Sequence, residues 1–444
     1  MLRTKLGFYM FNSHGHRRNA MTVGIVLVLT GSLGISVSAA KPIAKPKVSK
    51  AATITGMPKS ESILKVAKGT WLGAPKFTYK WYACATSGTA KTTLPTGCSA
   101  ISGATGTTLT LTTKQESKFI RVVVTAKNAG GTAISASATS AKITSPYALL
   151  WSEEFNGPIG IPASVRTSTQ DKNSDQNWDA VVTNSGGGNR ERQFYTDGVA
   201  SYNEDGSVAH NVIELDGDGH LVINAVRTQE ASGNKPSTEA PVKCYYGDCE
   251  FLSGRLESEK HVGFKYGMIE VRAKIPSTEG TWPAFWMLGM NHSEVDWPRC
   301  GEIDILEAAF AGARIGSAFG SLHSYPDNGF GVSKTIYPDF LKLYSEYHTF
   351  GMLREPDQIK FLFDGVPYFT ITKAEATSSK WAVSGKERSW PFDQEFYAIL
   401  NLAMGGTLGG GPGGSVTPDA TGGSLLVDWI RFHSYNGQGE IVRH

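Results

Sequence analysis

Short runs in which apolar and polar residues alternate recur through the C-terminal two thirds of the chain. A period of two sends successive side chains to opposite faces of a strand, so each run predicts a half-buried β-strand. Long stretches with the apolar spacing of a helix are nearly absent, and Asp364-Gly365 between two such runs is a hairpin signal. The clearest runs are residues 221–225, 268–273, 359–363 and 425–430. Many short strands predict an all-β fold, a large two-sheet sandwich over residues 146–444.

Residues 51–145 are richer in Thr, Ser, Ala, Gly and Val than the rest of the chain. They have about the length of an immunoglobulin-like β-sandwich of roughly 100 residues. They resemble the immunoglobulin-like modules that are attached to bacterial secreted enzymes. The motifs of this resemblance are residues 69–71, 79–81 and 121–125. The few aromatic residues sit where core residues would, which favours a spacer over a module that binds polysaccharide.

The N-terminus has the features of an export signal, which we place at residues 1–40. Arg3, Lys5, Arg17 and Arg18 precede an apolar run that ends in small residues. A membrane anchor is the alternative, because about 20 apolar residues can span a bilayer. Glycines and serines dilute the run, so we expect a cleaved signal, a secreted protein and no stable membrane insertion afterwards. The Pro- and Lys-rich residues 41–50 predict an extended linker.

The charge and the cysteines narrow the function further. The net charge is +3, and without a basic stripe it argues against nucleic acid as a partner. Export permits disulfides, and the five cysteines offer Cys84 with Cys98 and Cys244 with Cys249, which leaves Cys300 over. The spacing does not suit a thiolate metal site. We expect a monomer.

The segment of residues 301–307 carries the strongest chemical signal. Period-two alternation places Glu302 and Asp304 on one strand face, but Glu307 has the opposite parity. A one-residue bulge near Ile305 and Leu306 would return Glu307 to the face of the other two carboxylates.

Three carboxylates on one face repel one another, which stability alone seldom favours. A glycosidase needs such a group, because one carboxyl protonates the leaving oxygen and another acts at the anomeric carbon. Neighbouring charges can raise the pKa of the proton donor while its partner stays ionised. The alternatives are an exposed acidic edge or a calcium site.

Nearby residues fit a sugar-binding cleft. Trp282 and Trp286 share strand parity, and indoles stack on the apolar faces of sugar rings. They could instead fill the sandwich core. His323 could hydrogen-bond a sugar or the acid/base, although a single histidine is more often structural.

In these motifs, residues 147–435 resemble family 16 of the glycoside hydrolases, and within it the bacterial laminarinases. The acidic segment follows the laminarinase pattern, which is one residue longer than the lichenase pattern. Extra charge at residues 294–297 and the glycine-rich residues 409–414 depart from the family pattern. The matching motifs lie at residues 151–157, 189–196, 253–256, 266–274, 297–301, 401–410 and 427–431.

The resemblance implies a concanavalin A-like β-jelly-roll with a concave cleft and retention of the anomeric configuration. It implies Glu302 as nucleophile, Glu307 as acid/base and Asp304 as their partner. It implies no cofactor for the chemistry, but a structural calcium away from the cleft, with Glu154 and Asp428 where ligands are expected. By the same resemblance, the cleft residues would be Asn189, Arg190, Trp282, Trp286 and His323.

We therefore expect a secreted endo-acting hydrolase of β-1,3-glucan of the laminarin type, with β-glucan as its partner. Mixed-linkage β-1,3-1,4-glucan is a neighbouring substrate. The other possibilities are a galactan hydrolase or a transglycosylase on the same fold, and a non-catalytic β-glucan-binding protein. Relatives of the last kind typically lose the catalytic glutamates, and this chain keeps both.

Overall fold

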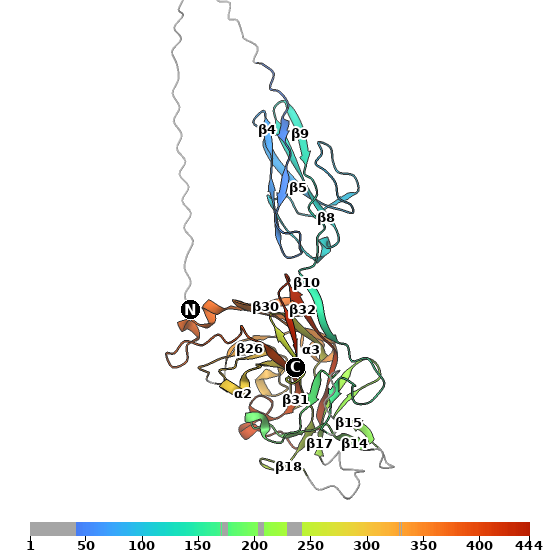
Figure 1. Ribbon diagram of the computed structural model, residues 1–444, viewed down its shortest axis with the longest axis vertical. Helices are drawn as coiled ribbons and strands as arrows, with labels where there is room; N and C mark the ends of the chain where they lie inside the picture. The colour runs from blue at the N-terminus through green and yellow to red at the C-terminus, as the bar shows by residue number, and fades with distance from the viewer. Residues whose placement is uncertain are drawn as a thin grey trace, which may run out of the picture.

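The computed structural model describes residues 41–168, 170, 176–202, 208–228, 242–327, 329 and 331–444. The predicted export signal lies outside these described residues. Among the described helices, none has the length and apolar character needed to cross a membrane. The chain folds into a small N-terminal unit and a larger domain, arranged along the long axis of the molecule (Figure 1).

The larger domain consists of two ten-stranded sheets, which confirms the predicted all-β jelly-roll sandwich. Its neighbouring strands are antiparallel except for two short parallel pairs at sheet edges. We call the first the site sheet. It runs β11 (Val165–Arg166), β12 (Trp178–Ala180), β21 (Arg255–Glu257), β31 (Phe396–Met404), β24 (Thr281–Gly289), β25 (Glu302–Ala308), β26 (Ala318–His323) and β27 (Val332–Ile336), with β22 (Val262–Lys265) and β33 (Glu440–Arg443) beside it.

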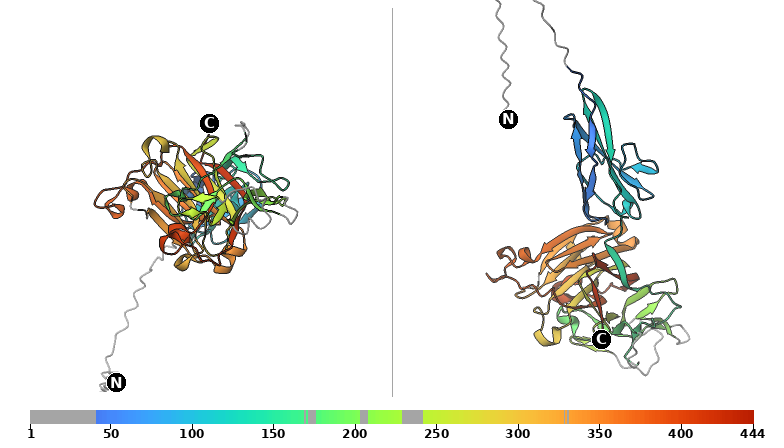
Figure 2. Two further views of the ribbon diagram at one scale, coloured as in Figure 1. Left: turned by 90° about the horizontal axis from the view of Figure 1, so that it is seen from below. Right: turned by 45° about the horizontal axis from the view of Figure 1, so that its top comes forward.

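The outer sheet is the second layer, which two further views also show (Figure 2). Strand β10 (Tyr147–Glu153) opens the domain and pairs with β32, the last long strand of this sheet, so that Tyr147 lies opposite Tyr435. The sheet runs β13 (Gln193–Tyr195), β20 (Phe251–Ser253), β17 (Leu221–Arg227), β32 (Gly422–Tyr435), β23 (Gly267–Lys274), β28 (His348–Glu355), β29 (Gln358–Phe363) and β30 (Val366–Thr372), with β16 (Ile213–Leu215) on β17.

One continuous core lies between the two sheets. Phe285 and Met287 contribute to it from the site sheet, and Val271 and Phe432 from the outer sheet. Each large apolar side chain buried in this way stabilises the fold by about 1.5–3 kcal/mol. Because this core takes one face of every site-sheet strand, the alternate side chains are left for the opposite face.

Short elements decorate the loops of the larger domain. Two hairpins are β14 (Val199–Tyr202) with β15 (Val208–Asn211), and β18 (Lys243–Cys244) with β19 (Gly247–Asp248). The described helices are α2 (His292–Val295), α3 (Phe340–Ser345), α4 (Lys373–Ala376) and α5 (Gly406–Gly409), with 3-10 turns η2 (Gly186–Gly188), η3 (Gly312–Arg314), η4 (Ser379–Trp381) and η5 (Pro412–Gly414). A further 3-10 turn, η1 (Thr113–Gln115), lies in the N-terminal unit.

The N-terminal unit, residues 41–145, has its own core around Trp81, formed by a three-stranded and a four-stranded sheet. Its immunoglobulin-like identity and the exact domain limits stay predictions. The linker predicted at residues 41–50 is shorter than expected, because its second half forms a strand in which Val48 pairs with Trp71. The lysines beside Val48 remain exposed to solvent. The strands are β1 (Lys47–Lys50), β2 (Thr53–Thr55), β3 (Ile63–Ala67), β4 (Thr70–Leu72), β5 (Lys76–Cys84), β6 (Cys98–Ala100), β7 (Thr108–Thr110), β8 (Phe119–Asn128) and β9 (Gly131–Ala136).

Few contacts join the two parts. The Glu61 carboxylate accepts hydrogen bonds from the hydroxyl groups of Tyr147, at 3.3 and 3.4 Å, and Tyr435, at 3.4 Å. Lys59 Nζ donates to Asn436 at 3.4 Å. Glu61 and Asn436 are exposed and the other three side chains are half-buried, so the junction depends on polar contacts near the surface and not on a shared core.

The cysteines are arranged as predicted. Disulfides join Cys84 to Cys98, and Cys244 to Cys249. Cys300 is a buried free thiol.

Candidate active site

The predicted bulge is present in β25. Against β24, Asp304 lies opposite Trp286 and Leu306 opposite Phe285, so Ile305 is the extra residue. Ile305 and Leu306 are consecutive, yet both are buried in the sandwich core. Since two neighbouring residues face inward, Glu307 returns to the outward face.

The carboxylates meet on this outward face. Ser321 of β26 donates a hydrogen bond to Asp304 Oδ2 at 2.5 Å, and its Oγ lies 3.5 Å from Glu307 Oε2. His323, two residues further along β26, has Nε2 3.4 Å from Asp304 Oδ2 and 3.9 Å from Glu302 Oε1. One strand and its neighbour therefore bring all three predicted acidic residues together.

The electrostatics of the two glutamates are asymmetric. Burial, followed by repulsion from Asp304, raises the pKa of Glu302 to about 8 and the pKa of Glu307 well above its usual range. His323 opposes this rise at both groups. Each glutamate also accepts an indole N–H, Glu302 from Trp297 at 3.0 Å and Glu307 from Trp282 at 3.1 Å, and both bonds favour the ionised form. Of the two glutamates, the His323 cation lies within 4 Å of Glu302 only, at 3.9 Å, so Glu302 is the easier of the two to ionise and Glu307 keeps its proton more firmly.

Both predicted tryptophans of β24 lie on the site face and not in the core. Trp282 Nε1 donates to Glu307 Oε1 at 3.1 Å. Trp286 Nε1 donates to Asn401 Oδ1 at 2.7 Å, and the Arg255 guanidinium lies 5.0 Å from the centre of its ring. The indoles therefore border the carboxylates, where a sugar ring could stack on them.

A second polar chain continues the floor of the site away from Trp286. Asn401 Nδ2 donates to the Tyr195 hydroxyl at 3.0 Å, and that hydroxyl donates to Glu191 Oε2 at 3.1 Å. Gln193 Nε2 also donates to Glu191, at 2.7 Å. All these side chains are buried, and their hydrogen bonds fix the orientation of Asn401, which is the partner of Trp286.

The other two predicted cleft residues lie at one end of the site. Asn189 Nδ2 lies 3.4 Å from Glu191 Oε1, and Asn189 is half-buried. A Cβ at Gly406 would lie 3.0 Å from the Asn189 carbonyl and 3.3 Å from the Trp282 ring, so glycine allows the two to approach. Arg190 is exposed beside Gly414 in the glycine-rich tract.

The sequence analysis missed the groups that hold His323. Its Nδ1 lies 3.2 Å from Asp327 Oδ2, and Asp327 is paired with Arg388 at 2.7 Å. The side chain of Asp327 is fully buried. Burial by itself lowers the pKa of His323, but pairing with Asp304 and Asp327 outweighs it and raises the pKa to about 11. His323 is therefore a cation at neutral pH.

Of the residues that support His323 and Glu302, only Trp297 could have been found from the sequence. Asp327 follows His323 by four residues, in a loop whose course the alternation of residues does not predict. Arg388 comes from a loop after η4, far away in the chain. Trp297 precedes the acidic strand by five residues, and its place in the Trp297-Pro298 motif was the one usable hint.

The predicted calcium ligands have arginine partners instead. Both oxygens of Glu154 accept from Arg431, at 2.9 and 2.8 Å, and Asp428 is paired with Arg272. Carboxylates neutralised by guanidinium groups do not fit a calcium site. In the described ranges, three or more acidic, histidine or cysteine groups come within 4.8 Å of one another only where His323 meets Glu302 and Asp304. Because His323 is there a cation, that group is an ion-pair network.

The chain is similar in sequence to several named proteins. The sequence profile described as "Glycosyl hydrolases family 16" matches residues 211–430. The glucan endo-1,3-beta-glucosidase of Cryptopygus antarcticus is 32% identical over 271 residues, which are 60% of this chain and 83% of that protein. The glucan endo-1,3-beta-glucosidase A1 of Niallia circulans is 29% identical over 292 residues, 64% of this chain, and the match spans only 37% of that protein.

Among solved structures, the laminarinase from Rhodothermus marinus is 30% identical, with a TM-score of 0.48, over 65% of this chain and 98% of that one. The profile match covers the acidic strand and most of both sheets, and the Cryptopygus protein is matched over most of its length. The chain therefore belongs to family 16 of the glycosyl hydrolases.

Proposed function

We propose that this protein is a secreted, retaining endo-β-1,3-glucanase that acts on laminarin-type β-glucan. The bulge in β25 carries the proposal, because it sets Glu307 on the face of Glu302 and Asp304. The choice of β-1,3-glucan is supported by the two relatives named as glucan endo-1,3-beta-glucosidases.

The roles follow from the neighbours of each group. Glu302, which receives the Trp297 N–H and faces His323, attacks the anomeric carbon and forms a glycosyl–enzyme ester. Glu307 gives its proton to the leaving oxygen. It then takes a proton from the water that cleaves the ester, which returns Glu302 as a carboxylate. Two inversions at the anomeric carbon give net retention.

Asp304 and His323 act on the charges of this cycle. Asp304 is buried between the two glutamates, and its charge raises the pKa of both, which keeps a proton on Glu307 before the first step. The His323 cation stabilises Glu302 whenever Glu302 is a carboxylate. We assign the substrate to the face that Trp282, Trp286 and Asn189 border, with Arg190 at its rim.

Export and the monomeric state are part of the proposal. Export is supported by the basic, apolar and small-residue order of residues 1–40. The N-terminal mass of the protein recovered from culture medium tests it, and a protein that keeps residues 1–40 would contradict it. Size-exclusion chromatography with light scattering tests the monomer.

Product analysis on defined polysaccharides tests the activity. Reducing ends and oligosaccharides are measured on laminarin, lichenan, agarose and carrageenan. We expect release of oligosaccharides of mixed length from laminarin, which marks an endo mode. Activity confined to agarose or carrageenan would replace the assignment with a galactan hydrolase. Binding of laminarin without hydrolysis would replace it with a glucan-binding protein.

Proton NMR of the first products tests the stereochemistry. We expect the β-anomer to appear before mutarotation, because a retaining enzyme releases the configuration of its substrate. Initial α-anomer would contradict Glu302 as nucleophile. Added glucoside acceptors measure how much of the intermediate is transferred to sugar instead of water.

A further inference from the structure

The charges of the chain are divided unequally between its two parts. Residues 41–145 contain 14 lysines, one arginine, two glutamates and no aspartate. Residues 146–444 contain 38 acidic and 24 basic residues. The small net charge of the whole chain therefore hides a strongly basic N-terminal unit joined to an acidic domain.

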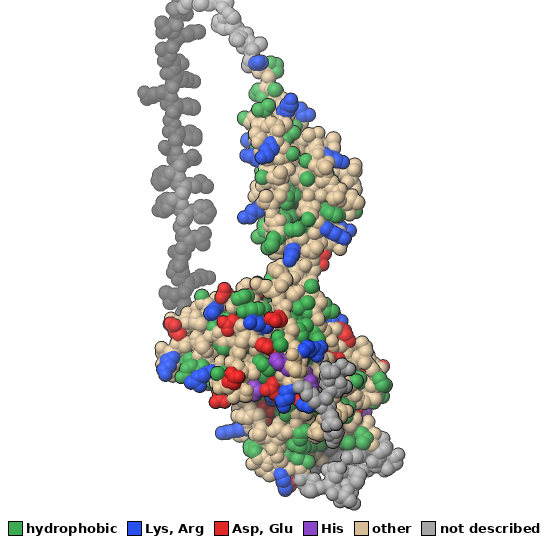
Figure 3. Space-filling view, viewed as in Figure 1, with side chains coloured by type: hydrophobic (Ala, Val, Ile, Leu, Met, Phe, Trp, Pro, Cys, Tyr) green, Lys and Arg blue, Asp and Glu red, His purple; other side chains and the backbone are tan. Residues whose placement is uncertain are grey.

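The positive charges of the N-terminal unit are available to a partner. Its lysines are exposed, apart from Lys59, which is half-buried. Both carboxylates of the unit are engaged by hydroxyl groups, Glu116 by Ser60 at 2.5 Å and Glu61 by the two junction tyrosines. On the face shown in Figure 3, lysine side chains spread over the unit, and acidic side chains lie almost entirely on the larger domain.

Three lysines share one sheet face in an arrangement that folding does not favour. In the β5–β8 pair, Lys76 lies directly opposite Lys127, and Lys80 points to the same side four residues along β5. The intervening Phe77 and Tyr79 point to the opposite, core side of β5. Like charges directly opposite each other destabilise a strand pair. We call this surface, formed by Lys76, Lys80 and Lys127, the basic face.

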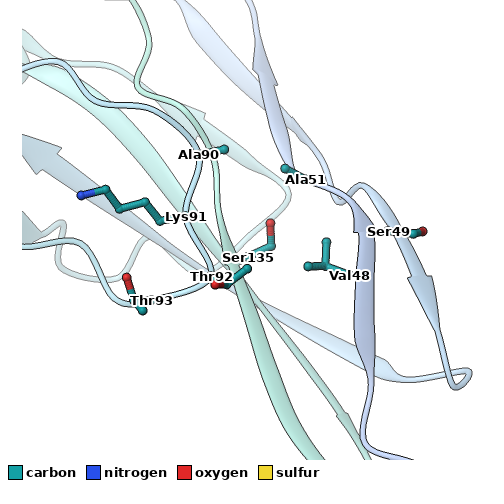
Figure 4. A pocket seen from close by; sticks show the side chains of 8 residues that line it. All are labelled: Val48, Ser49, Ala51, Ala90, Lys91, Thr92, Thr93 and Ser135. Carbon is teal, nitrogen blue, oxygen red and sulfur yellow. The ribbon is translucent and has the colours of Figure 1, made fainter.

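The composition of the unit indicates which polyanion it fits. Lysine presents a compact point charge, whereas arginine supplies the flat fork used for phosphate and base recognition, and the one arginine here, Arg121, is buried. On the basic face itself, Thr78 lies opposite Thr125 between the lysines, so hydroxyl groups stand beside the cations. A separate pocket of about 450 Å³ at the β1 and β9 edge lies on the other side of the sheet and is not part of the basic face (Figure 4). It is lined by Val48, Ser49, Ala51, Ala90, Lys91, Thr92, Thr93 and Ser135. Hydroxyls and ammonium groups without a carboxylate suit an acidic sugar.

We propose that the basic face of the N-terminal unit binds a carboxylate-bearing polysaccharide. The acidic catalytic domain is repelled by such a polymer, so the unit would hold the enzyme in an acidic matrix while the cleft stays free for neutral glucan. This inference is independent of the proposed glucanase activity, because the binding surface and the cleft share no residues.

The test measures binding of polygalacturonate to the full chain without its signal, residues 41–444, at about 50 and 300 mM NaCl. The variant Lys76→Glu/Lys80→Glu/Lys127→Glu reverses the basic face. Its control is Lys334→Glu/Lys342→Glu/Lys386→Glu, which reverses three exposed lysines of the catalytic domain. Hydrolysis of laminarin by both variants, together with their thermal unfolding, reports that they are folded.

We expect wild-type binding that weakens with salt, a loss of about 10-fold or more in the first variant, and a change of about twofold or less in the control. Absence of binding, or equal losses in both variants, would overturn the proposal. So would tighter binding to duplex DNA or to anionic phospholipid vesicles at the same salt. A wild-type chain that binds polygalacturonate but leaves laminarin intact would refute the glucanase assignment alone.

Discussion

Glu302 and Glu307 are the same residue type on one strand, yet their neighbours divide the work between them. Glu302 receives an indole N–H from Trp297 and lies near the His323 cation. Glu307 lies further from that cation, with Trp282 and Ser321 at its oxygens. Since each glutamate accepts an indole N–H, the cation makes the difference: Glu302, which is nearer to His323, suits the nucleophile, and Glu307 suits the proton donor.

Substitution of the two glutamates separates these roles. Glu302→Gln is expected to lower kcat on laminarin at least about 10³-fold, because the amide cannot form the ester intermediate. Glu307→Gln is expected to cost about 10²–10⁴-fold on laminarin. The loss should be much smaller on an aryl β-glucoside, whose leaving group needs no proton. The exposed Glu279→Gln is the control, and equal losses on both substrates in the Glu307 variant would contradict the assignment.

His323 depends on a buried pair behind it. Burial by itself would raise the pKa of Asp327, but His323 and Arg388 outweigh burial and lower it to about 2. Asp327 is therefore a carboxylate throughout the working pH range, and it keeps His323 charged. A cation beside Glu302 then persists even above neutral pH.

Asp327→Asn should make catalysis depend on the protonation of His323. The pKa of His323 is raised in the fold, so its stabilising effect is complete below its unfolded value of about 6.5 and is lost as pH rises through about 11. In the variant this loss moves toward neutral pH. The ratio of variant to wild-type kcat should therefore fall with rising pH, by on the order of 10-fold.

The control for this experiment is Asp364→Asn, which alters a similar pair with His348, at 2.9 Å, on the outer sheet. It should leave the pH profile unchanged. A pH-independent loss in Asp327→Asn would show that Asp327 matters for folding and not for the charge of His323.

The bulge shows why the carboxylates could be predicted and most of their supports could not. Glu302, Asp304 and Glu307 lie within one strand, so parity and one bulge relate them. His323 was a candidate from its motif and the family resemblance, but its approach to the carboxylates, like that of Ser321, depends on the register of a neighbouring strand, which alternation does not encode. Asp327 and Arg388 come from loops, where no periodicity exists.

Deletion of Ile305 tests the geometry of the strand. Removing the extra residue leaves Leu306 as a single inward residue, and Glu307 keeps Ala284 and Phe319 as neighbours. We expect a folded enzyme with measurable activity and an altered preference between laminarin and lichenan. Its free energy of unfolding in urea should fall by about 2–5 kcal/mol, as buried isoleucine is lost.

The matched variant, Leu306→Glu/Glu307→Leu, exchanges two neighbours without changing length or composition. It turns a carboxylate toward the core and should abolish hydrolysis. An active exchange variant would show that the outward direction of residue 307 is not required.

The predicted strands were correct where one face is solvated or lines the site. Residues 268–273 fall within β23 and residues 359–363 within β29, and both show alternation in burial. By contrast, every residue of β31 is buried, because that strand is central in its sheet and both of its faces are covered. Alternation cannot reveal such a strand. The linker was overestimated for a related reason, since Pro46 is buried in a segment that reads as solvated.

The molecule has two cores with a polar junction between them. The core around Trp81 and the core of the sandwich have no residue in common. Exposed hydrogen bonds such as those of Glu61 contribute on the order of 1 kcal/mol or less each. Little free energy therefore fixes the orientation of the N-terminal unit relative to the larger domain.

Glu61→Ala is expected to loosen this orientation. It removes the acceptor shared by Tyr147 and Tyr435, so small-angle scattering should show a wider spread of overall dimensions than wild type. Laminarin hydrolysis should be unchanged, because the junction lies outside the site. Glu116→Ala, which removes the other carboxylate of the unit, is the control. Identical scattering from Glu61→Ala and wild type would show that the junction is held by other contacts.

The pairing of β10 with β32 has a consequence for the biogenesis of the enzyme. The first strand of the catalytic domain pairs with a strand that is synthesised much later, as Tyr147 opposite Tyr435 illustrates. Such distant pairing makes folding slow, and the sandwich cannot close before its C-terminal end has emerged. A translocation channel threads only an open chain. If the protein is exported as we propose, this strand pair keeps the sandwich open until β32 is available.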